Sequence, residues 1–197
     1  MSEPAHLAHL LQALRDVMNW MRAKSVKGII IGGVAASLHG RPRVTRDVDA
    51  MVLLALENWG KFLTAGKQFG FSPRIDDPLD FARKTRVLLM RHQPSGIDID
   101  ISFGALPFEE ESIARAVSFN VSDIKLLLPT PEDLIIMKAV AHRSRDLIDI
   151  AAVVEVQAKL DVRRIRRWVR DFSKAMEMPE ILEDLERILA RRKKRKY

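Results

Sequence analysis

Cysteine is missing from the 197-residue chain. Its absence excludes disulfide bonds, thiolate metal sites and cysteine nucleophiles, and it fits a reducing compartment. Long apolar runs are missing too: none approaches the ~18 residues expected of a membrane-spanning helix. The first residues, from Met1 to His6, lack a basic stretch followed by an apolar one, so no secretory signal is expected. We therefore expect a cytoplasmic protein with no membrane partner.

Acidic residues are fewer than basic ones, and the excess of positive charge is unevenly distributed along the chain. The net charge is +7, and the segment from Asp161 to the end holds thirteen Lys/Arg against seven Asp/Glu. Its cations concentrate around Trp168, between Arg163 and Arg170, and in a terminal run over 191–196. One interpretation is an attraction to the phosphate backbone of RNA. The other is a solvated helix end, where cations are favoured.

Apolar periodicity predicts a chain in two parts. Residues 1–129 alternate short apolar runs with helical stripes, which indicates an α/β domain with helices flanking a mixed sheet. At Thr130 and Pro131 a strong helix start opens a segment that is helical throughout, so residues 130–197 are predicted to form a helical bundle. The predicted strands cover 28–31, 48–54, 85–91, 97–103 and 124–128, and the first-domain helices cover 7–21, 34–39, 58–69 and 108–116.

Two glycines and two acids make the most informative stretch. A buried strand ends at Gly32-Gly33, and a short helix follows. Such a turn lets backbone N–H groups approach a phosphate, and the helix N-terminus adds positive potential. Asp47 and Asp49 then alternate along the next strand, so both side chains point to one face and can bridge one or two magnesium ions.

A second pair of acids lies on a later strand. Asp98, Asp100 and Ser102 share one face, because Ile99 and Ile101 alternate with them. If this strand neighbours the first, three or four carboxylates converge and repel one another without a cation. With magnesium they form a two-metal site for phosphoryl transfer. The alternative is that each pair is simply solvated and the glycines make a tight turn.

Two sequence blocks resemble a known family. The first runs Ile31-Gly32-Gly33-x-Ala35 and then Arg43-x-Thr45-x-Asp47-x-Asp49. The second runs Pro131-Glu132-Asp133-Leu134-Ile135-x-Met137-Lys138-x-x-Ala141-x-Arg143-x-Arg145-Asp146-x-x-Asp149. In this order the blocks resemble the minimal nucleotidyltransferase superfamily, and more narrowly its branch of AbiEii-type toxins and uncharacterised prokaryotic relatives. The resemblance covers most of residues 28–155.

The resemblance implies a nucleotidyltransferase fold and activity, with an NTP as substrate and Mg²⁺ or Mn²⁺ as cofactor. It implies a possible toxin–antitoxin or phage-defence role, with a cognate antitoxin protein as partner. It makes Asp47 and Asp49 the metal-binding pair. It leaves Asp98 or Asp100 as the third acid and favours Asp100, because the spacing to Gly104 matches best. The implied nucleotide-binding residues are Gly32, Gly33, Arg43, Lys138 and Arg143.

Two alternatives stay open at the level of sequence. Lys138, Arg143, Asp146 and Asp149 fit an ion-pair network between two helices as well as a contact with the nucleotide. The chain as a whole is either a transferase acting on a hydroxyl of RNA, protein or a small molecule, or a non-catalytic nucleotide- or RNA-binding module that keeps the fold.

Overall fold

The structure is a computed structural model that describes residues 3–194. Its contacts divide the chain into two compact units. The first comprises Met1–Val34 and Val44–Leu128, and the second comprises Ala35–Arg43 and Pro129–Tyr197. The sequence alone assigned residues 35–43 to the α/β domain. They group with the helices because Gly40 packs against Val153 and Arg43 pairs with Asp149.

The first unit is built on a mixed five-stranded sheet with the order β1-β2-β5-β4-β3. Strands β2 and β5 are parallel, and the other neighbouring pairs are antiparallel. A separate antiparallel hairpin joins β6 and β7. The bounds are β1 (Lys27–Ile30), β2 (Asp47–Leu53), β3 (Phe71–Pro73), β4 (Val87–His92), β5 (Ile97–Phe103), β6 (Val117–Val121) and β7 (Ile124–Leu128).

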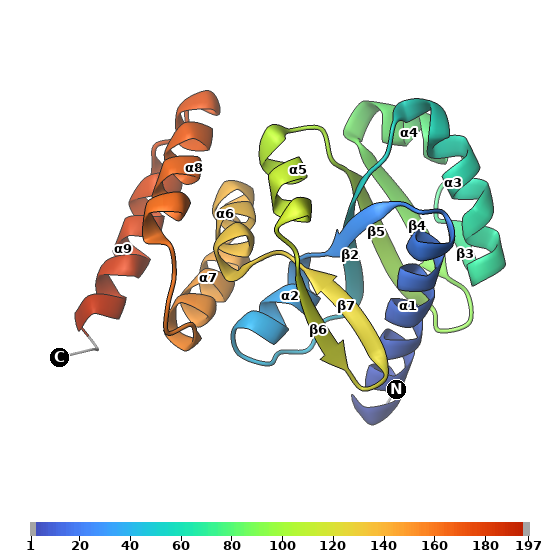
Figure 1. The fold of residues 1–197 in the computed structure, drawn as a ribbon, viewed down its shortest axis with the longest axis horizontal. Helices are drawn as coiled ribbons and strands as arrows, with labels where there is room; N and C mark the ends of the chain where they lie inside the picture. The colour runs from blue at the N-terminus through green and yellow to red at the C-terminus, as the bar shows by residue number, and fades with distance from the viewer. Residues whose placement is uncertain (1–2, 195–197) are drawn as a thin grey trace. The chain divides into compact units, whose positions relative to one another are not determined.

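Helices α1 (Glu3–Ala23) and α3 (Trp59–Gly66) cover the apolar face of this sheet (Figure 1). The Trp20 ring of α1 stacks on Phe62 of α3 at 4.2 Å between ring centroids, and it is fully buried. Such aromatic contacts dominate the stability of a small core. Helices α4 (Pro78–Thr85) and α5 (Pro107–Ala114) complete the unit, with 3₁₀ turns at Leu56–Asn58 and Lys67–Phe69.

Helix α2 (Gly32–His39) contributes its first residues to the first unit and the rest to the second. The second unit otherwise consists of α6 (Pro131–Ala141), α7 (Ser144–Val156), α8 (Val162–Ala175) and α9 (Glu180–Lys194). The Thr130 hydroxyl accepts a hydrogen bond from the Asp133 amide at 3.2 Å, which is the N-cap that the sequence predicts for α6. The apolar stripes meet in a core that includes Ile150, Ile165 and Leu185.

The predicted fold class is confirmed: a mixed sheet with flanking helices precedes a helical bundle. The predicted hairpin of β4 and β5 is present as well. Three elements were missed, namely β3, α4 and β6. They are short, and packing rather than local pattern stabilises them. Within residues 3–194, no helix is long and apolar enough to cross a membrane.

Candidate active site

The four acids singled out from the sequence lie on neighbouring parallel strands. Asp47 of β2 is in register with Asp98 of β5, and Asp49 is in register with Asp100. All four therefore share one face of the sheet, whereas Val48 and Ile99 point to the other face and are fully buried. The two strands are neighbours, which is the condition for the acids to converge, so the carboxylates lie beside one another.

The glycine turn lies against one of these acids. The Ile31 amide donates to the Asp49 carbonyl at 2.8 Å, which ties the end of β1 to β2. Gly32 follows with a φ of +60°, and a Cβ at this position would overlap the Asp49 carboxylate. Only glycine combines this backbone conformation with so close an approach. The start of α2 is thereby placed next to the acids, where its N-terminal amides add positive potential.

Two arginines that the sequence analysis did not select compensate the acids of β5. The Arg91 guanidinium donates from Nε to Asp98 Oδ1 at 2.7 Å. Arg74, one residue beyond β3, pairs with Asp98 Oδ2 at 3.2 Å and also forms an ion pair with Asp100. Asp98 is thus held by two cations, whereas Asp100 is held by Arg74.

The surroundings shift the two β5 carboxyls in opposite directions. The hydrogen bond from Arg91 holds the pKa of Asp98 below its usual value. Burial raises the pKa of Asp100, and the charges of Asp47 and Asp98 raise it further, against the opposing charge of Arg74. An acid whose ionised form is less favoured is a better proton acceptor near neutral pH. The two acids of β5 thus differ in their surroundings, and Asp100 is the one that the spacing to Gly104 also favours.

Thr45 is a further residue that the sequence analysis did not assign to the site. Its hydroxyl lies 3.3 Å from Asp47 Oδ1 and 3.3 Å from the Asp47 carbonyl. The His6 ring in turn contacts the Thr45 carbonyl at 2.7 Å. Thr45 is buried, so it can fix the orientation of the more exposed Asp47. No periodicity marks such a residue; only its position two before the first acid could have suggested it.

The chemistry of the donors fits a divalent cation. Carboxylate oxygens are the ligands that Mg²⁺ prefers, and Asp47, Asp49 and Asp100 present three of them on one face. Among the residues that the structure describes, however, no group of three acidic or histidine side chains is arranged to hold a metal ion. Arg91 and Arg74 each contact one oxygen of Asp98, and Arg74 also contacts one oxygen of Asp100.

The predicted residues of the helical unit form an ion-pair network. Lys138 Nζ lies 2.8 Å from Asp146 Oδ1 and 2.7 Å from Asp149 Oδ2, and all three side chains are buried. Arg43 makes a bidentate contact with Asp149 at 2.9 and 3.0 Å. Arg143 donates to Asp146 at 2.6 Å, although 76% of its side chain is exposed. This is the network between α6 and α7 that the sequence allowed as an alternative to nucleotide contact.

The balance of charge in the network determines how Asp146 ionises. Burial alone would raise the pKa of Asp146, but hydrogen bonds from Arg143 and Lys138 outweigh it and hold the pKa below its ordinary value. Removing one partner of such a buried pair is costly, because the other charge is left uncompensated. Lys138 is therefore a structural residue of the helical unit, whatever else it contacts.

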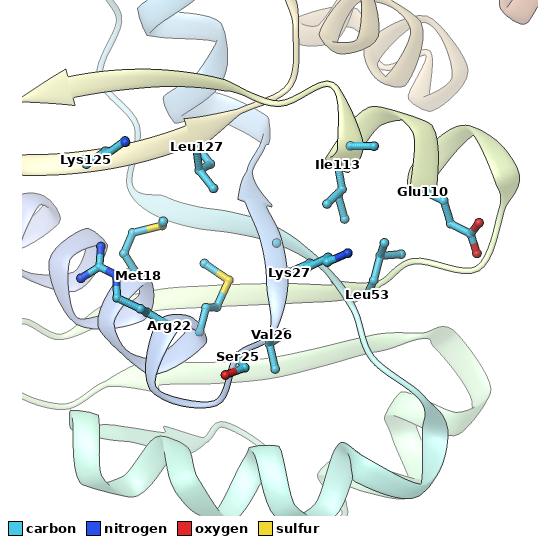
Figure 2. Close-up of a pocket in the computed structure, with 13 residues that line it drawn as sticks. Met18, Arg22, Ser25, Val26, Lys27, Leu53, Glu110, Ile113, Lys125 and Leu127 are labelled. Carbon is cyan, nitrogen blue, oxygen red and sulfur yellow. The ribbon is translucent and has the colours of Figure 1, made fainter.

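One cavity of the first unit lies away from the acids. It has a volume of about 970 Å³ and lies by Leu53, at the far end of β2 from Asp47. Figure 2 shows Met18, Lys27 and Leu127 around it. A second cavity of about 660 Å³ also includes Leu53. None of the four acids lines either cavity.

Three solved structures are similar in fold. An antigenic nucleotidyltransferase-like protein from Paracoccidioides brasiliensis is 15% identical, with a TM-score of 0.57 and coverage of 89% of this chain and 92% of that one. The antibiotic-resistance factor ANT(2'')-Ia in solution is 12% identical, with a TM-score of 0.59 and coverage of 87% and 95%. The lincosamide antibiotic adenylyltransferase LnuA, bound to lincomycin, is 12% identical, with a TM-score of 0.51 and coverage of 80% and 99%.

These identities are low, so the three structures establish the fold alone. A comparison with curated protein sequences finds no match. A family model described as "Nucleotidyltransferase of unknown function (DUF6036)" matches residues 5–194, which is nearly the whole chain. The prediction of a nucleotidyltransferase is thereby confirmed at the level of the family. The chain belongs to this DUF6036 family of nucleotidyltransferases.

Proposed function

We propose that this protein transfers a nucleotidyl group from an NTP to a hydroxyl acceptor at the acids of β2 and β5. The single observation that carries the proposal is the register of Asp49 with Asp100 on parallel strands, beside a turn that only Gly32 can form. Membership of a nucleotidyltransferase family supports the reaction class.

We assign different roles to the four acids according to their surroundings. Asp47, Asp49 and Asp100 would hold Mg²⁺ or Mn²⁺, which would supply positive charge against the triphosphate. The acceptor oxygen forms a bond to the α-phosphorus, the bond from that phosphorus to its bridging oxygen breaks, and pyrophosphate leaves. Asp100 takes the proton of the acceptor hydroxyl. Asp98, held by Arg74 and Arg91, is assigned to positioning rather than to the metal.

The proposed nucleotide contacts include the glycine turn of the first unit. Gly32, Gly33 and the start of α2 present backbone amides to the triphosphate, as helix N-termini commonly do for anions. For the helical unit, the resemblance of its sequence block implies Arg143 as a nucleotide-binding residue, and most of its side chain is exposed. Lys138 and Arg43 act mainly by holding Asp146 and Asp149, so their part in nucleotide binding is indirect.

Incubation with each α-labelled NTP, in Mg²⁺ or Mn²⁺, tests the proposal against RNA, protein and small-molecule acceptors such as aminoglycosides. The proposal predicts label transfer that Asp49→Asn abolishes. Asp76→Asn is the matched control, because Asp76 is an exposed acid of the same unit. A protein that binds NTP but transfers no label to any acceptor, and whose binding is indifferent to Asp49→Asn, would instead be a non-catalytic nucleotide-binding module.

A toxin role is a second proposal, and the motif from Pro131 to Asp149 supports it through its resemblance to AbiEii-type proteins. In this role the transferase modifies a host component, and a cognate antitoxin protein blocks it. Expression of the chain alone should arrest bacterial growth, and Asp49→Asn should relieve the arrest at equal protein level. Normal growth with abundant wild-type protein would contradict the toxin role and leave the transferase proposal standing.

A further inference from the structure

Helix α8 carries a row of cations that the catalytic proposal does not use. Arg163, Arg167, Arg170 and Lys174 are spaced four, three and four residues apart, so they lie on one face of the helix. All four are exposed. At ~1.5 Å per residue the row extends about 16 Å along the helix. We call these four residues the α8 ridge.

Two other cations of the same helix pair with carboxylates of neighbouring helices, which distinguishes them from the four residues of the ridge. Arg164 is buried and donates to Asp133 at 2.8 Å, which ties α8 to α6. Arg166 makes a bidentate contact with Glu186 of α9 at 2.6 and 2.7 Å. Among the side chains described over residues 5–191, no carboxylate pairs with a ridge residue. Asp171 lies beside the ridge, four residues after Arg167 and three before Lys174, but no ion pair joins it to either of them in the described part of the chain.

The ridge has the chemistry of a phosphate-binding surface. Three of its four residues are arginines, whose planar guanidinium groups bind phosphate oxygens in a bidentate manner. One strand of a nucleic acid places a phosphate every ~3.4 Å of duplex axis, so 16 Å of ridge matches about five phosphates. The Arg167 guanidinium lies 5.6 Å from the centre of the Trp168 ring, and Trp168 stacks on Phe172. Aromatic rings beside arginines favour unstacked bases, as in single-stranded RNA.

A lipid surface fits the same helix poorly. Helices that lie on membranes insert an apolar face between the headgroups. The apolar face of α8 is already used: Ile165 and Val169 are fully buried within the helical unit. Its partly exposed aromatic residues, Trp168 and Phe172, stack on each other, so the exposed side of α8 offers mainly charge.

We propose that the α8 ridge binds the phosphate backbone of RNA. The binding follows from the ridge alone. A role of that RNA as the acceptor of the nucleotidyl group rests on the proposed function.

The test compares two variants of the full chain, each with four cations changed to Gln. The ridge variant is R163Q/R167Q/R170Q/K174Q. The matched control is K24Q/K61Q/K67Q/R83Q, which removes four exposed cations of the α/β unit and lowers the net charge by the same amount. Both variants keep the basic run at 191–196, part of which lies outside the described residues. Fluorescence anisotropy with a labelled 20-nucleotide RNA, without NTP or metal, gives affinity against salt concentration.

The ridge variant should bind RNA at least about tenfold more weakly than wild type in 100 mM salt. The slope of log K against log salt concentration should become less steep by about two to three. The control should match wild type, and both should keep the wild-type melting temperature. Equal losses in the two variants would overturn the proposal, as would tighter binding to duplex DNA, to an acidic protein or to anionic vesicles. Because no transfer is measured, this result is independent of whether the acids of β2 and β5 catalyse a reaction.

Discussion

The Arg74 guanidinium forms an ion pair with the Asp100 carboxylate, the acid to which we assign both metal binding and proton transfer. Arg74 thus compensates the charge of an acid that, in our proposal, would also hold the cation. Two cations beside one carboxylate repel each other, so binding of metal and the Arg74 contact should compete.

Arg74→Gln should therefore tighten the binding of Mn²⁺ severalfold and lower the melting temperature of the metal-free protein. Mn²⁺ affinity is measured by titration with electron paramagnetic resonance, and melting by calorimetry. Arg91→Gln is the matched control, because Arg91 pairs with Asp98 alone and should leave the affinity for Mn²⁺ unchanged. Weaker Mn²⁺ binding by Arg74→Gln would show that the arginine supports the metal site instead of competing with it.

A pair of glycine variants isolates the contact between the turn and Asp49. Gly32 and Gly96 both have a positive φ, +60° and +71°, so alanine at either position costs about 1 kcal/mol or more in backbone strain. A Cβ at Gly96 meets nothing within 4 Å, whereas one at Gly32 overlaps the Asp49 carboxylate. Gly32→Ala should thus lose more stability in urea unfolding than Gly96→Ala, and it alone should weaken Mn²⁺ binding. Equal effects on Mn²⁺ would contradict the proximity of turn and acid.

The buried network of the helical unit predicts a large effect of Lys138. Lys138→Met leaves Asp146 and Asp149 with less compensation, so urea unfolding should show a loss of about 3–5 kcal/mol. Lys84→Met is the control, since Lys84 belongs to an exposed pair with Asp80 and should leave the midpoint unchanged. A normal midpoint for Lys138→Met, with loss of NTP binding, would reverse our assignment and make Lys138 a nucleotide ligand.

Asp146 makes a prediction about pH. Its pKa is lowered on folding from an ordinary value of 3.8, so its contribution to stability is complete above that value and is lost as pH falls through the folded pKa. Asp146→Asn should be less stable than wild type at pH 7, and the difference in unfolding free energy should shrink below about pH 4. Urea unfolding between pH 3 and pH 7 measures it. A difference that stays constant over this range would mean that Asp146 is not ionised in the native network.

The sequence predicted the acids of the site but not what compensates them. Asp47, Asp49, Asp98 and Asp100 could be placed on one face because strands alternate with a period of two. Arg74 could not be found, because it directly follows the short strand β3, which has no clear sequence pattern of its own and forms through its pairing with β4. Pairing between distant segments depends on tertiary structure, so local sequence periodicity does not predict it.

The same limit applies to the helical unit. The spacing of Lys138, Arg143, Asp146 and Asp149 fits ion pairing and nucleotide contact equally well, because both need these charges on neighbouring helical turns. Only burial and distance distinguish them: Lys138 is buried between two carboxylates, whereas most of the Arg143 side chain is exposed. Residues 35–43 likewise belong to the helical unit through contacts such as the pairing of Arg43 with Asp149. This contact joins segments more than one hundred residues apart in the sequence.

The most direct test of the account is a crystal soaked with Mn²⁺ and a non-hydrolysable NTP analogue, examined by anomalous diffraction at the manganese edge. We predict an anomalous peak bounded by the carboxylates of Asp47, Asp49 and Asp100, with the Arg74 guanidinium moved off Asp100. Manganese bound elsewhere, or no peak while Arg74 stays paired with Asp100 at saturating Mn²⁺, would contradict the assignment of these acids as the metal-binding centre.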